Sequence, residues 1–517
     1  MALGDPPPRD DPGDDASLTA PPMAEDREPR AAGILSNTLY GLLAQASTSV
    51  FTAILTLYLV RALGPKGFGT FSLALSIGGI TLLLSDLSIS NSAARFVAES
   101  RRDRGAIAAV AATALGMKLA IGTVVSAALF LLASPIARAY GQHGLVWPLR
   151  GIALTVFAQS LMGLYIYTFT ALRRVSLNFG IVFFESLFET TASIALVALG
   201  GGAAGAAFGR AIGNAIGAAA GIIICIRVIG RGALSLRTAS ASRMREIARY
   251  ARPLFVTNSA YALYSTIDVL LIGALLSTAS VGLFSAPLRL MAFLAQPGTA
   301  LSGAVAPRLA REGDTEPDVR PFNATLRWMV ILQALLIAPI VVWARPIVAV
   351  LLGPDFSGAA VVVRALAPAI FLSGISPILS VGVNYLGAAG RRIPIVLGAL
   401  AINTAIDLAL LRQIGVVAAA IGTSVAYSVY VAGHFQICRR MIDIPLRPLL
   451  VTFARSMAAA GAMAGVLFLV GTRDLSIGEW IAGALVGSLC AFVVLFATGE
   501  VSVKELRSLA RLRHAKE

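Results

Sequence analysis

Cysteine and histidine are both scarce in this sequence, with three of each among 517 residues. Numbers this small, spread this widely, supply neither a disulfide framework nor a cluster of metal ligands, so no metal site is expected. A phosphate-cradling loop is also missing, because the glycine-rich run at 200–205 lacks the Lys and Ser/Thr that must follow it. The sequence therefore predicts no cofactor and no ATP hydrolysis. The six scarce residues are Cys225, Cys438, Cys490, His143, His434 and His514.

Charged residues make up only 13% of the chain, whereas 57% of its residues are hydrophobic and the mean hydropathy is +0.80. This apolar content exceeds what the core of a soluble protein needs. Apolar runs long enough to cross a bilayer recur along the chain and predict an all-α polytopic membrane protein with about 14 transmembrane helices. The predicted spans are 35–60, 68–90, 107–133, 147–171, 178–199, 203–226, 253–275, 282–306, 324–345, 358–386, 393–412, 415–437, 449–471 and 477–498.

Arginine and lysine are concentrated in alternate loops between these spans, which places most of them on one side of the membrane. Because cytoplasmic loops carry the excess of Lys and Arg, this side is predicted to be cytoplasmic, with both termini there. The topology accounts for the formal net charge of +15, since the basic residues form no aromatic-interleaved surface for nucleic acid. We expect membrane lipids as partners and no nucleic acid.

Short stretches of the sequence recur after 213 residues. GTFS at 69–72 matches GLFS at 282–285, and Arg95 matches Arg308. These matches predict two copies of a six-helix unit; because six is even, the axis relating them runs along the membrane normal. Two such lobes would enclose a central cavity. The predicted segments are a disordered cytoplasmic tail at 1–31, an N-lobe at 32–230, a basic cytoplasmic linker at 231–252, a C-lobe at 253–440, helices 13 and 14 at 441–499, and a basic cytoplasmic tail at 500–517.

Four stretches carry a family resemblance through their order along the chain: DLSISNSAARFVAESRRDRG at 86–105, IDVLLIGALLSTASVGLFSAPLRL at 267–290, LLGPDFSGAAVVVRALAP at 351–368 and INTAIDLALLRQIGVVAAAIGTSVAY at 402–427. Together they resemble the polysaccharide-type flippases of the multidrug, oligosaccharidyl-lipid and polysaccharide exporter superfamily. The resemblance implies two six-helix bundles in a V and a location in the bacterial inner membrane. It also implies translocation of an undecaprenyl-diphosphate-linked oligosaccharide from the cytoplasmic to the outer leaflet by alternating access, with a polysaccharide polymerase as a partner.

Other functions stay open as alternatives. The drug-extruding branch relies on an acidic residue in its first helix, and residues 34–60 contain no Asp or Glu, which weakens drug or cation antiport. Peptidoglycan-precursor flippases carry arginines in their first helices, whereas Arg61 lies here at a span end. An enzyme is not expected, because the outer loops are short and poor in acidic residues. A non-transporting scaffold of a polysaccharide assembly complex is an alternative that would tolerate apolar replacement of the intramembrane charges.

Ionisable residues inside the predicted spans are expensive to insert, so each is expected to face a cavity or a partner. Arg289, Arg210 and Lys118 are candidates for binding the diphosphate, because a cavity with positive character suits an anion and guanidinium can hold phosphate oxygens bidentately. At roughly 1.5 Å per residue, Glu189 matches Arg210 in depth and Asp268 matches Arg289, which predicts two ion pairs. The alternative is that such pairs only staple helices together.

Acidic residues inside the spans are candidates for coupling transport to H⁺ or Na⁺. Glu185 and Glu189 share a helix face at i, i+4, where adjacent carboxylates repel and one can be held protonated. Asp268 is the other candidate, and a packed, hydrogen-bonded carboxyl is the alternative for all three. Three arginines in the basic loops could attract the diphosphate before it enters, or only set the topology; they are Arg95, Arg173 and Arg174.

Overall fold

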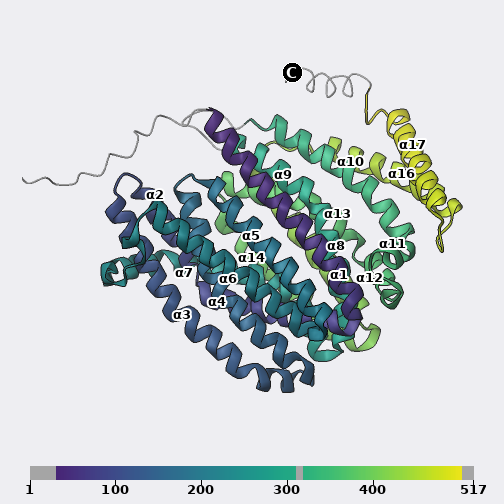
Figure 1. The fold of residues 1–517 in the computed structure, drawn as a ribbon. Helices are drawn as coiled ribbons and strands as arrows, with labels where there is room; N and C mark the ends of the chain where they lie inside the picture. Colours follow the sequence, from purple (N-terminus) through teal and green to yellow (C-terminus); the bar gives the residue numbers. More distant parts are fainter. Residues whose placement is uncertain (1–30, 310–317, 503–517) are drawn as a thin grey trace, which may run out of the picture.

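Helices account for the regular secondary structure of the computed structural model, which describes residues 31–309 and 318–502 (Figure 1). Within those ranges, 11 helices are long and apolar enough to cross a membrane, as predicted for an all-α polytopic membrane protein. The predicted tails at 1–31 and 500–517 lie almost wholly outside the described residues. The α-helices are α1 (Ala31–Asp86), α2 (Ile89–Glu99), α3 (Arg104–Ala139), α4 (Val146–Ala171), α5 (Val175–Leu196), α6 (Gly202–Val228), α7 (Ala241–Leu275), α8 (Thr278–Met291), α9 (Gln296–Val305), α10 (Arg320–Val342), α11 (Ala344–Leu351), α12 (Ala359–Ala365), α13 (Ala367–Tyr385), α14 (Arg392–Ile414), α15 (Val417–Met441), α16 (Leu446–Val470) and α17 (Ile477–Ala497).

Two of the 11 candidate spans, Leu39–Asp86 and Val175–Val228, are each long enough for two membrane crossings, and glycines at positive φ divide them. Gly64 (φ 63°) and Pro65 break α1 between the first two predicted spans, and Gly200 (φ 89°) lies in the turn that separates α5 from α6. Glycine adopts positive φ without a Cβ penalty, and proline cannot donate the helical hydrogen bond at the break. With both spans divided, and with α15 added, the arrangement is consistent with the fourteen predicted helices.

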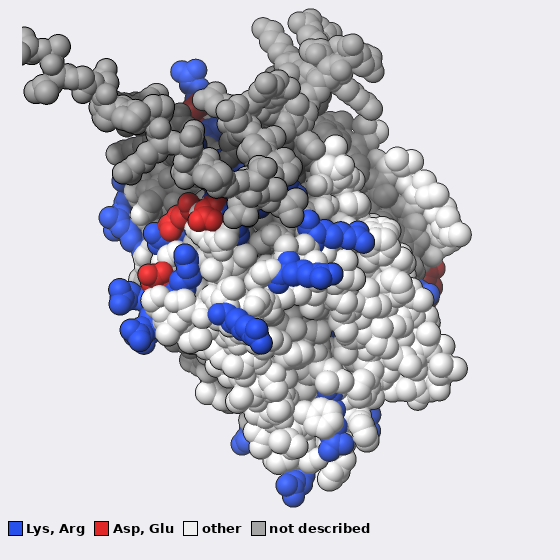
Figure 2. Space-filling view, turned by 60° about the vertical axis from the view of Figure 1, so that its left-hand side comes forward, with Lys and Arg blue, Asp and Glu red and all other residues white. Residues whose placement is uncertain are grey.

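The helices form two groups that follow the order of the sequence. In the first group α4 and α5 both pack against α6, and α1 packs against α5; in the second group α14 packs against α15 and α7. We call the end formed by the loops 100–103, 172–174, 229–240 and 386–391 the arginine-rich end, and the opposite end the arginine-poor end. Figure 2 shows Lys and Arg side chains at its left edge and across its middle, with a smaller group at its bottom.

The predicted linker at 231–252 is largely ordered helix rather than connecting chain. Short 3₁₀ turns span 231–234 and 236–238, and α7 begins at Ala241 and continues through Pro253. The boundary predicted at residue 253 therefore falls inside a helix. The arginines of this helix lower its hydropathy and so concealed it in the sequence. Ile247 and Ala251 are buried on one face, while Arg245, Arg249 and Arg252 are exposed on the other.

The two groups meet at the arginine-poor end through a close contact between α1 and α8. A Cβ built on Gly69 would lie 1.7 Å from the carbonyl oxygen of Thr278, and one on Gly282 would lie 2.0 Å from that of Pro65. These contacts exchange under the 213-residue shift, because Pro65 corresponds to Thr278 and Gly69 to Gly282. A two-fold relation between two copies produces contacts that exchange in this way. We call this contact the glycine seam.

Apolar side chains surround the glycine seam. Phe71 and its 213-residue counterpart Phe284 are both buried, in one hydrophobic cluster with Leu59 and Phe356. Arg61, at the end of the first span, donates a hydrogen bond to the carbonyl oxygen of Val350. The seam and this cluster together join the two groups of helices at the arginine-poor end.

The last two helices attach to the side of the second group. Trp343 donates a 2.9 Å hydrogen bond from Nε1 to the carbonyl oxygen of Gly471 and packs edge-on against Trp480. Toward the arginine-rich end, Glu500 accepts hydrogen bonds of 2.8 Å from both Arg327 and Thr452. The pair α16 and α17 is thus fastened to α10 at both ends.

Candidate functional site

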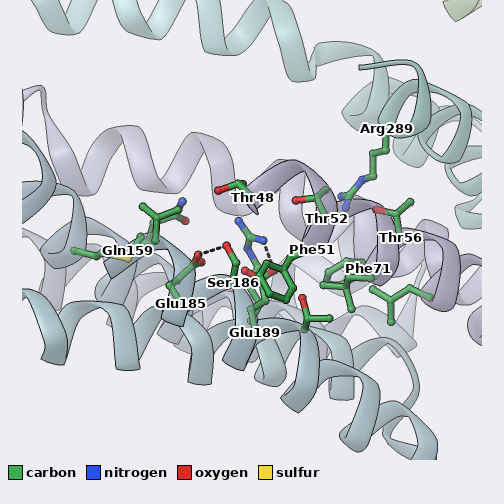
Figure 3. A pocket seen from close by; sticks show the side chains of 16 residues that line it. Thr48, Phe51, Thr52, Thr56, Phe71, Gln159, Glu185, Ser186, Glu189 and Arg289 are labelled. Atoms are coloured by element: carbon green, nitrogen blue, oxygen red, sulfur yellow. Dashed lines mark hydrogen bonds and ion pairs between the residues drawn. The ribbon is translucent and has the colours of Figure 1, made fainter. Parts of the chain in front are cut away.

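A cavity of about 270 Å³ lies among α1, α4, α5 and α6 and reaches α8 of the second group (Figure 3). At about 30 Å³ per molecule, this volume corresponds to roughly nine waters. Its wall combines aromatic rings and hydroxyl groups with four ionisable side chains, and it lies next to the glycine seam through Phe71. The ionisable residues are Glu185, Glu189, Arg210 and Arg289.

The predicted ion pair between Arg210 and Glu189 is present, with Nη1 of the arginine 2.5 Å from Oε1 of the glutamate. Gly213 allows α5 and α6 to approach this closely, since a Cβ there would lie 2.5 Å from the Cβ of Glu189. Glu185 lies one turn away and accepts a 3.1 Å hydrogen bond from Ser186. Of the two carboxylates, only Glu189 is ion-paired with Arg210, so Glu185 is left in the cavity wall without an ion pair among the described residues.

Arg289 projects from α8 into the same cavity (Figure 3). The centre of its guanidinium lies 5.4 Å from the ring centroid of Phe68 and 5.6 Å from that of Phe71, within cation–π range. Among the described residues it forms no ion pair, so the predicted pair with Asp268 is wrong. An equal predicted depth in the membrane does not fix the direction in which two side chains point. Arg289 points from α8 toward α1, whereas Asp268 faces α14 and α15.

Asp268 belongs to a second, buried polar cluster. It accepts a 2.5 Å hydrogen bond from the Asn403 amide and a 2.7 Å bond from the Thr423 hydroxyl. Asp407 lies beside it, fully buried, and neither its oxygens nor the amide oxygen of Asn403 receive a hydrogen bond from the described residues. A Cβ on Gly422 would meet Asn403 Oδ1 at 2.7 Å and Asp407 Oδ1 at 2.8 Å, so these oxygens converge.

These converging oxygens could bind a cation or a proton. Carboxylate, amide and hydroxyl oxygens are ligands for hard cations, and two adjacent buried carboxylates also favour a shared proton. We call Asp268, Asn403, Asp407 and Thr423 the oxygen cluster. Sequence reasoning selected only Asp268 from it, because Asn403 and Thr423 are uncharged and Asp407 had no visible partner. The i, i+4 spacing of Asn403 and Asp407 on α14 is the signal that could have revealed the cluster.

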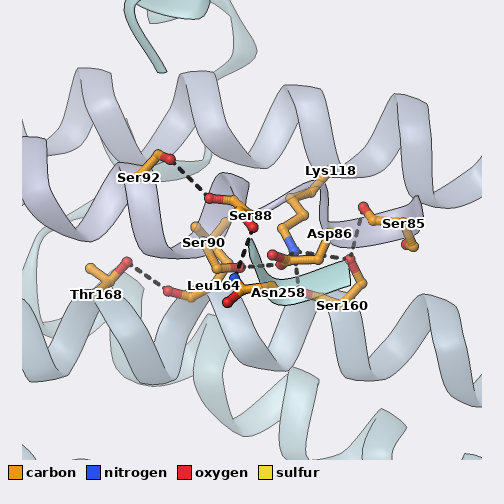
Figure 4. Close-up of polar contacts among 10 residues, drawn as sticks. All are labelled: Ser85, Asp86, Ser88, Ser90, Ser92, Lys118, Ser160, Leu164, Thr168 and Asn258. Carbon is orange, nitrogen blue, oxygen red and sulfur yellow. Dashed lines mark hydrogen bonds and ion pairs between the residues drawn. The ribbon is translucent and has the colours of Figure 1, made fainter. Parts of the chain in front are cut away.

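Lys118 does not line the cavity. Its ammonium group is fully buried and donates to the Asp86 carboxylate and to the Ser160 carbonyl and hydroxyl oxygens, at 3.1 and 3.0 Å (Figure 4). Asp86 was overlooked as the partner because it falls at the predicted end of the second span. Next to this pair, the Asn258 amide of α7 donates a 3.1 Å hydrogen bond to Ser88, so the two groups of helices also touch here.

The three arginines predicted in the basic loops lie on the surface, but Arg95 is part of helix α2 rather than of a loop. Arg95 forms a 2.8 Å ion pair with Glu99, and its guanidinium lies 4.3 Å from the ring centroid of Tyr250 on α7. Arg173 and Arg174 are exposed in the turn between α4 and α5. None of the three lines the cavity, so their part in attracting an anion stays a prediction.

Comparison with known proteins identifies relatives by sequence and by fold. The sequence profile of the family described as "Polysaccharide biosynthesis protein" matches residues 34–311. The "Probable low-salt glycan biosynthesis flippase Agl15" of Haloferax volcanii is 22% identical over 247 residues, which are 47% of this chain and 52% of that protein. The matched region thus spans about half the length of this relative.

Two solved structures share the fold. A structure titled "Lipid II flippase MurJ, inward closed conformation" has a TM-score of 0.72 with 13% identity and covers 90% of this chain and 99% of its own. An inward-facing multidrug resistance MATE family transporter of the MOP superfamily has a TM-score of 0.63 with 14% identity and covers 77% of this chain and 98% of its own. At these identities the likeness establishes the architecture only, that of a polytopic helical membrane protein.

Proposed function

Since the chain belongs to the polysaccharide biosynthesis protein family, we propose that it is a flippase for an undecaprenyl-diphosphate-linked oligosaccharide. In this proposal it moves the lipid-linked glycan from the cytoplasmic to the outer leaflet of the bacterial inner membrane, for synthesis of a cell-surface polysaccharide. It acts as a transporter rather than an enzyme, and the polymerase that uses the flipped glycan is the expected partner. The arginine-rich end, and both termini with it, face the cytoplasm under the positive-inside rule.

The observation that supports this function best is Arg289. It reaches from α8 into the cavity formed by α1, α4, α5 and α6 and forms no ion pair among the described residues, whereas the neighbouring Arg210 is held by Glu189. An unpaired guanidinium inside a membrane protein favours an anionic ligand, because it can donate two hydrogen bonds to phosphate oxygens while keeping its charge. A lipid diphosphate is such an anion.

Alternating access requires one closed end and one open end at a time. The glycine seam and the phenylalanines around it close the arginine-poor end. In our proposal the headgroup enters the cavity from the cytoplasmic side in this conformation, and separation of α1 from α8 then opens the outer side. The prenyl tail stays in the lipid throughout.

The oxygen cluster supports coupling of transport to a cation. We expect Na⁺ or H⁺ to bind at Asp268 and Asp407, because these two buried acids lie side by side and the oxygens of Asn403 and Asp407 converge next to them. Glu185 offers a second protonation site, directly in the cavity wall. Binding of a cation at either place would favour one arrangement of the helices over the other.

The test is to replace Arg289 by glutamine in a strain whose surface glycan depends on this protein. Arg364→Gln is the matched control, since Arg364 sits on α12 outside the cavity and donates to the Val341 carbonyl oxygen. We expect Arg289→Gln to weaken binding of the lipid diphosphate by about tenfold or more, because about 1.4 kcal/mol of binding free energy is lost. Surface glycan should fall accordingly, with unchanged protein in the membrane fraction. Normal surface glycan in Arg289→Gln would contradict phosphate binding and favour a non-transporting scaffold.

A further inference from the structure

The arginine-rich end of the first group carries far more arginines than acidic residues. The stretches 95–104, 173–174 and 227–252 together contain thirteen arginines and three acidic residues. Six of these arginines are exposed and form no ion pair among the described residues, and we call them the basic face: Arg102, Arg104, Arg173, Arg174, Arg245 and Arg249.

The three acidic residues do not neutralise the basic face. Glu99 forms its ion pair with Arg95, and the Asp103 side chain accepts a 3.0 Å hydrogen bond from the Ala106 amide at the start of α3. Glu246 is exposed and makes no ion pair in the described part of the chain. An excess of positive charge is therefore left on this surface, where it attracts anions.

Contacts between separate segments bring the arginines of the basic face to one region. Arg101 donates a 2.8 Å hydrogen bond from Nε to the Ala171 carbonyl oxygen, which joins the loop between α2 and α3 to the turn between α4 and α5. The guanidinium of Arg95 on α2 lies 4.3 Å from the ring centroid of Tyr250, which brings the first turns of α7 to the same end. A single anionic segment could therefore contact arginines from all three places.

Residues 1–30, which precede the described part of the chain, have the opposite charge. They contain eight of the 27 acidic residues and only three arginines, a net charge of −5 in a chain whose formal net charge is +15. Topology does not account for this, because acidic residues contribute little to the positive-inside rule. Four of the acids are close together in the sequence: Asp10, Asp11, Asp14 and Asp15.

Helix α1 begins near the basic face. Pro65, at the glycine seam, lies 34 residues after Ala31, or roughly 50 Å along the helix, so α1 starts at the arginine-rich end (Figure 1). Near that start Tyr40 packs against Phe179 of α5, with ring centroids 6.1 Å apart, and Arg174 directly precedes α5. Since an extended chain covers about 3.3 Å per residue, the aspartates can reach the basic face.

We propose that the acidic segment of residues 1–30 binds the basic face of its own chain and shields those arginines from other anions. A carboxylate can accept two hydrogen bonds from one guanidinium. Single surface ion pairs contribute little, but several charges acting together contribute more, and covalent attachment raises the effective concentration of the segment at this surface. The inference does not depend on the proposed function.

The test measures how fast a cysteine in the acidic segment forms a disulfide with a cysteine at the basic face. Ala16→Cys follows the four aspartates, and Ser176→Cys is exposed two residues after Arg174. The full chain, without its three native cysteines, is placed at one copy per nanodisc and oxidised with copper phenanthroline. The nanodiscs contain phosphatidylcholine alone or phosphatidylcholine mixed with phosphatidylglycerol.

Two variants of this parent each remove four charges from the proposed contact, and a third is the matched control. Asparagine replaces the four aspartates in the first variant, and glutamine replaces four arginines of the basic face in the second. The control also loses four exposed arginines, but at the arginine-poor end. The substitutions are Asp10→Asn/Asp11→Asn/Asp14→Asn/Asp15→Asn, Arg173→Gln/Arg174→Gln/Arg245→Gln/Arg249→Gln and, for the control, Arg138→Gln/Arg345→Gln/Arg412→Gln/Arg473→Gln.

We expect the asparagine variant and the basic-face variant to form the disulfide about tenfold more slowly than the parent, and the control to match the parent. High salt should slow the parent, because it screens exposed charges. With phosphatidylglycerol present, the parent should stay several-fold faster than the asparagine variant. An asparagine variant as fast as the parent overturns the proposal. So does a parent that falls to the rate of the asparagine variant in phosphatidylglycerol, since the arginines would then bind anionic lipid headgroups instead.

Discussion

Single residues in this protein are placed by the rotation of their helices as much as by their depth. The pair of Glu189 and Arg210 followed from the sequence, because these two lie on neighbouring helices joined by a short turn, which fixes both height and direction. The pair of Asp268 and Arg289 did not form, since α7 and α8 present those residues to different neighbours. The depth of a side chain in the membrane can be predicted from its position along the span. The direction in which it points depends on how the helices pack, which a single sequence does not show.

The oxygen cluster gives a prediction at this scale. A cation that binds only the folded protein stabilises it by about 2.7 kcal/mol when present at 100 times its dissociation constant. We expect thermal unfolding of the wild type in detergent to shift upward when NaCl replaces choline chloride, or upward as the pH falls if the bound cation is H⁺. Asp407→Asn should remove that shift.

The matched control for this measurement is Asp355→Asn, an exposed aspartate in the same half of the chain. It should keep the full response of the wild type. If Na⁺ or pH shifts the unfolding temperature of Asp407→Asn as much as that of the wild type, the oxygen cluster is not the cation site.

Helices were the most predictable level of the structure. Each of the fourteen predicted spans coincides with a helical segment, because runs of apolar residues bounded by glycine, proline and arginine leave little choice in a membrane. Three features escaped prediction: the joining of two spans across Gly64, the early start of α7 at Ala241, and the break between α8 and α9. All three depend on short segments where neighbouring helices, rather than hydropathy, decide the backbone.

The attachment of α16 and α17 gives a prediction at the scale of helices. Glu500 lies beyond the end of α17, outside the spans; burial acts to raise the pKa of its carboxyl, but hydrogen bonds from Arg327, Thr452 and Arg455 outweigh burial and lower the pKa. Since the folded pKa lies below the value of about 4.3 for unfolded Glu, the stabilisation is present above that pH and is lost as the pH falls through the folded pKa.

Glu500→Gln should therefore lower stability at neutral pH by about 1 to 3 kcal/mol, since it weakens hydrogen bonds between charged groups. It should also flatten the loss of stability below about pH 4.3. Thermal unfolding in detergent across this pH range measures both effects, with the exposed Glu246→Gln as the control. A variant as acid-sensitive as the wild type would show that Glu500 does not anchor these helices.

At the scale of the whole molecule, the two groups of helices are held together at several points of very different strength. The glycine seam brings backbone against backbone, while near the arginine-rich end side chains connect the same halves, through the hydrogen bond between Asn258 and Ser88 and the packing of Arg95 against Tyr250. Moving the halves apart at the seam must therefore disrupt the larger contact, and we expect the seam to decide which end is open.

Gly69→Ala tests this expectation. A methyl group there would clash with the Thr278 carbonyl oxygen and push α1 from α8, so the outer end should open more often. The readout is labelling of Ser72→Cys by a membrane-impermeant maleimide added from outside, in a background without the three native cysteines. Every 1.4 kcal/mol of destabilisation of the closed seam raises the labelling rate by about tenfold.

Gly79→Ala is the control, because it lies on the same helix with no other atom within 4 Å of its added Cβ. It should label at the rate of the Ser72→Cys parent. Equal labelling of Gly69→Ala and Gly79→Ala would mean that the seam does not govern the outer end.

The reciprocal geometry of the seam also bears on how the two halves can diverge. Elsewhere a substitution in one half meets mostly its own neighbours, so the halves can drift independently. Here each half supplies the small residue that admits the other half's backbone, and enlarging either residue harms a contact that both share. The 213-residue repeat predicted from the sequence should therefore be best preserved at this contact, where GTFS corresponds to GLFS.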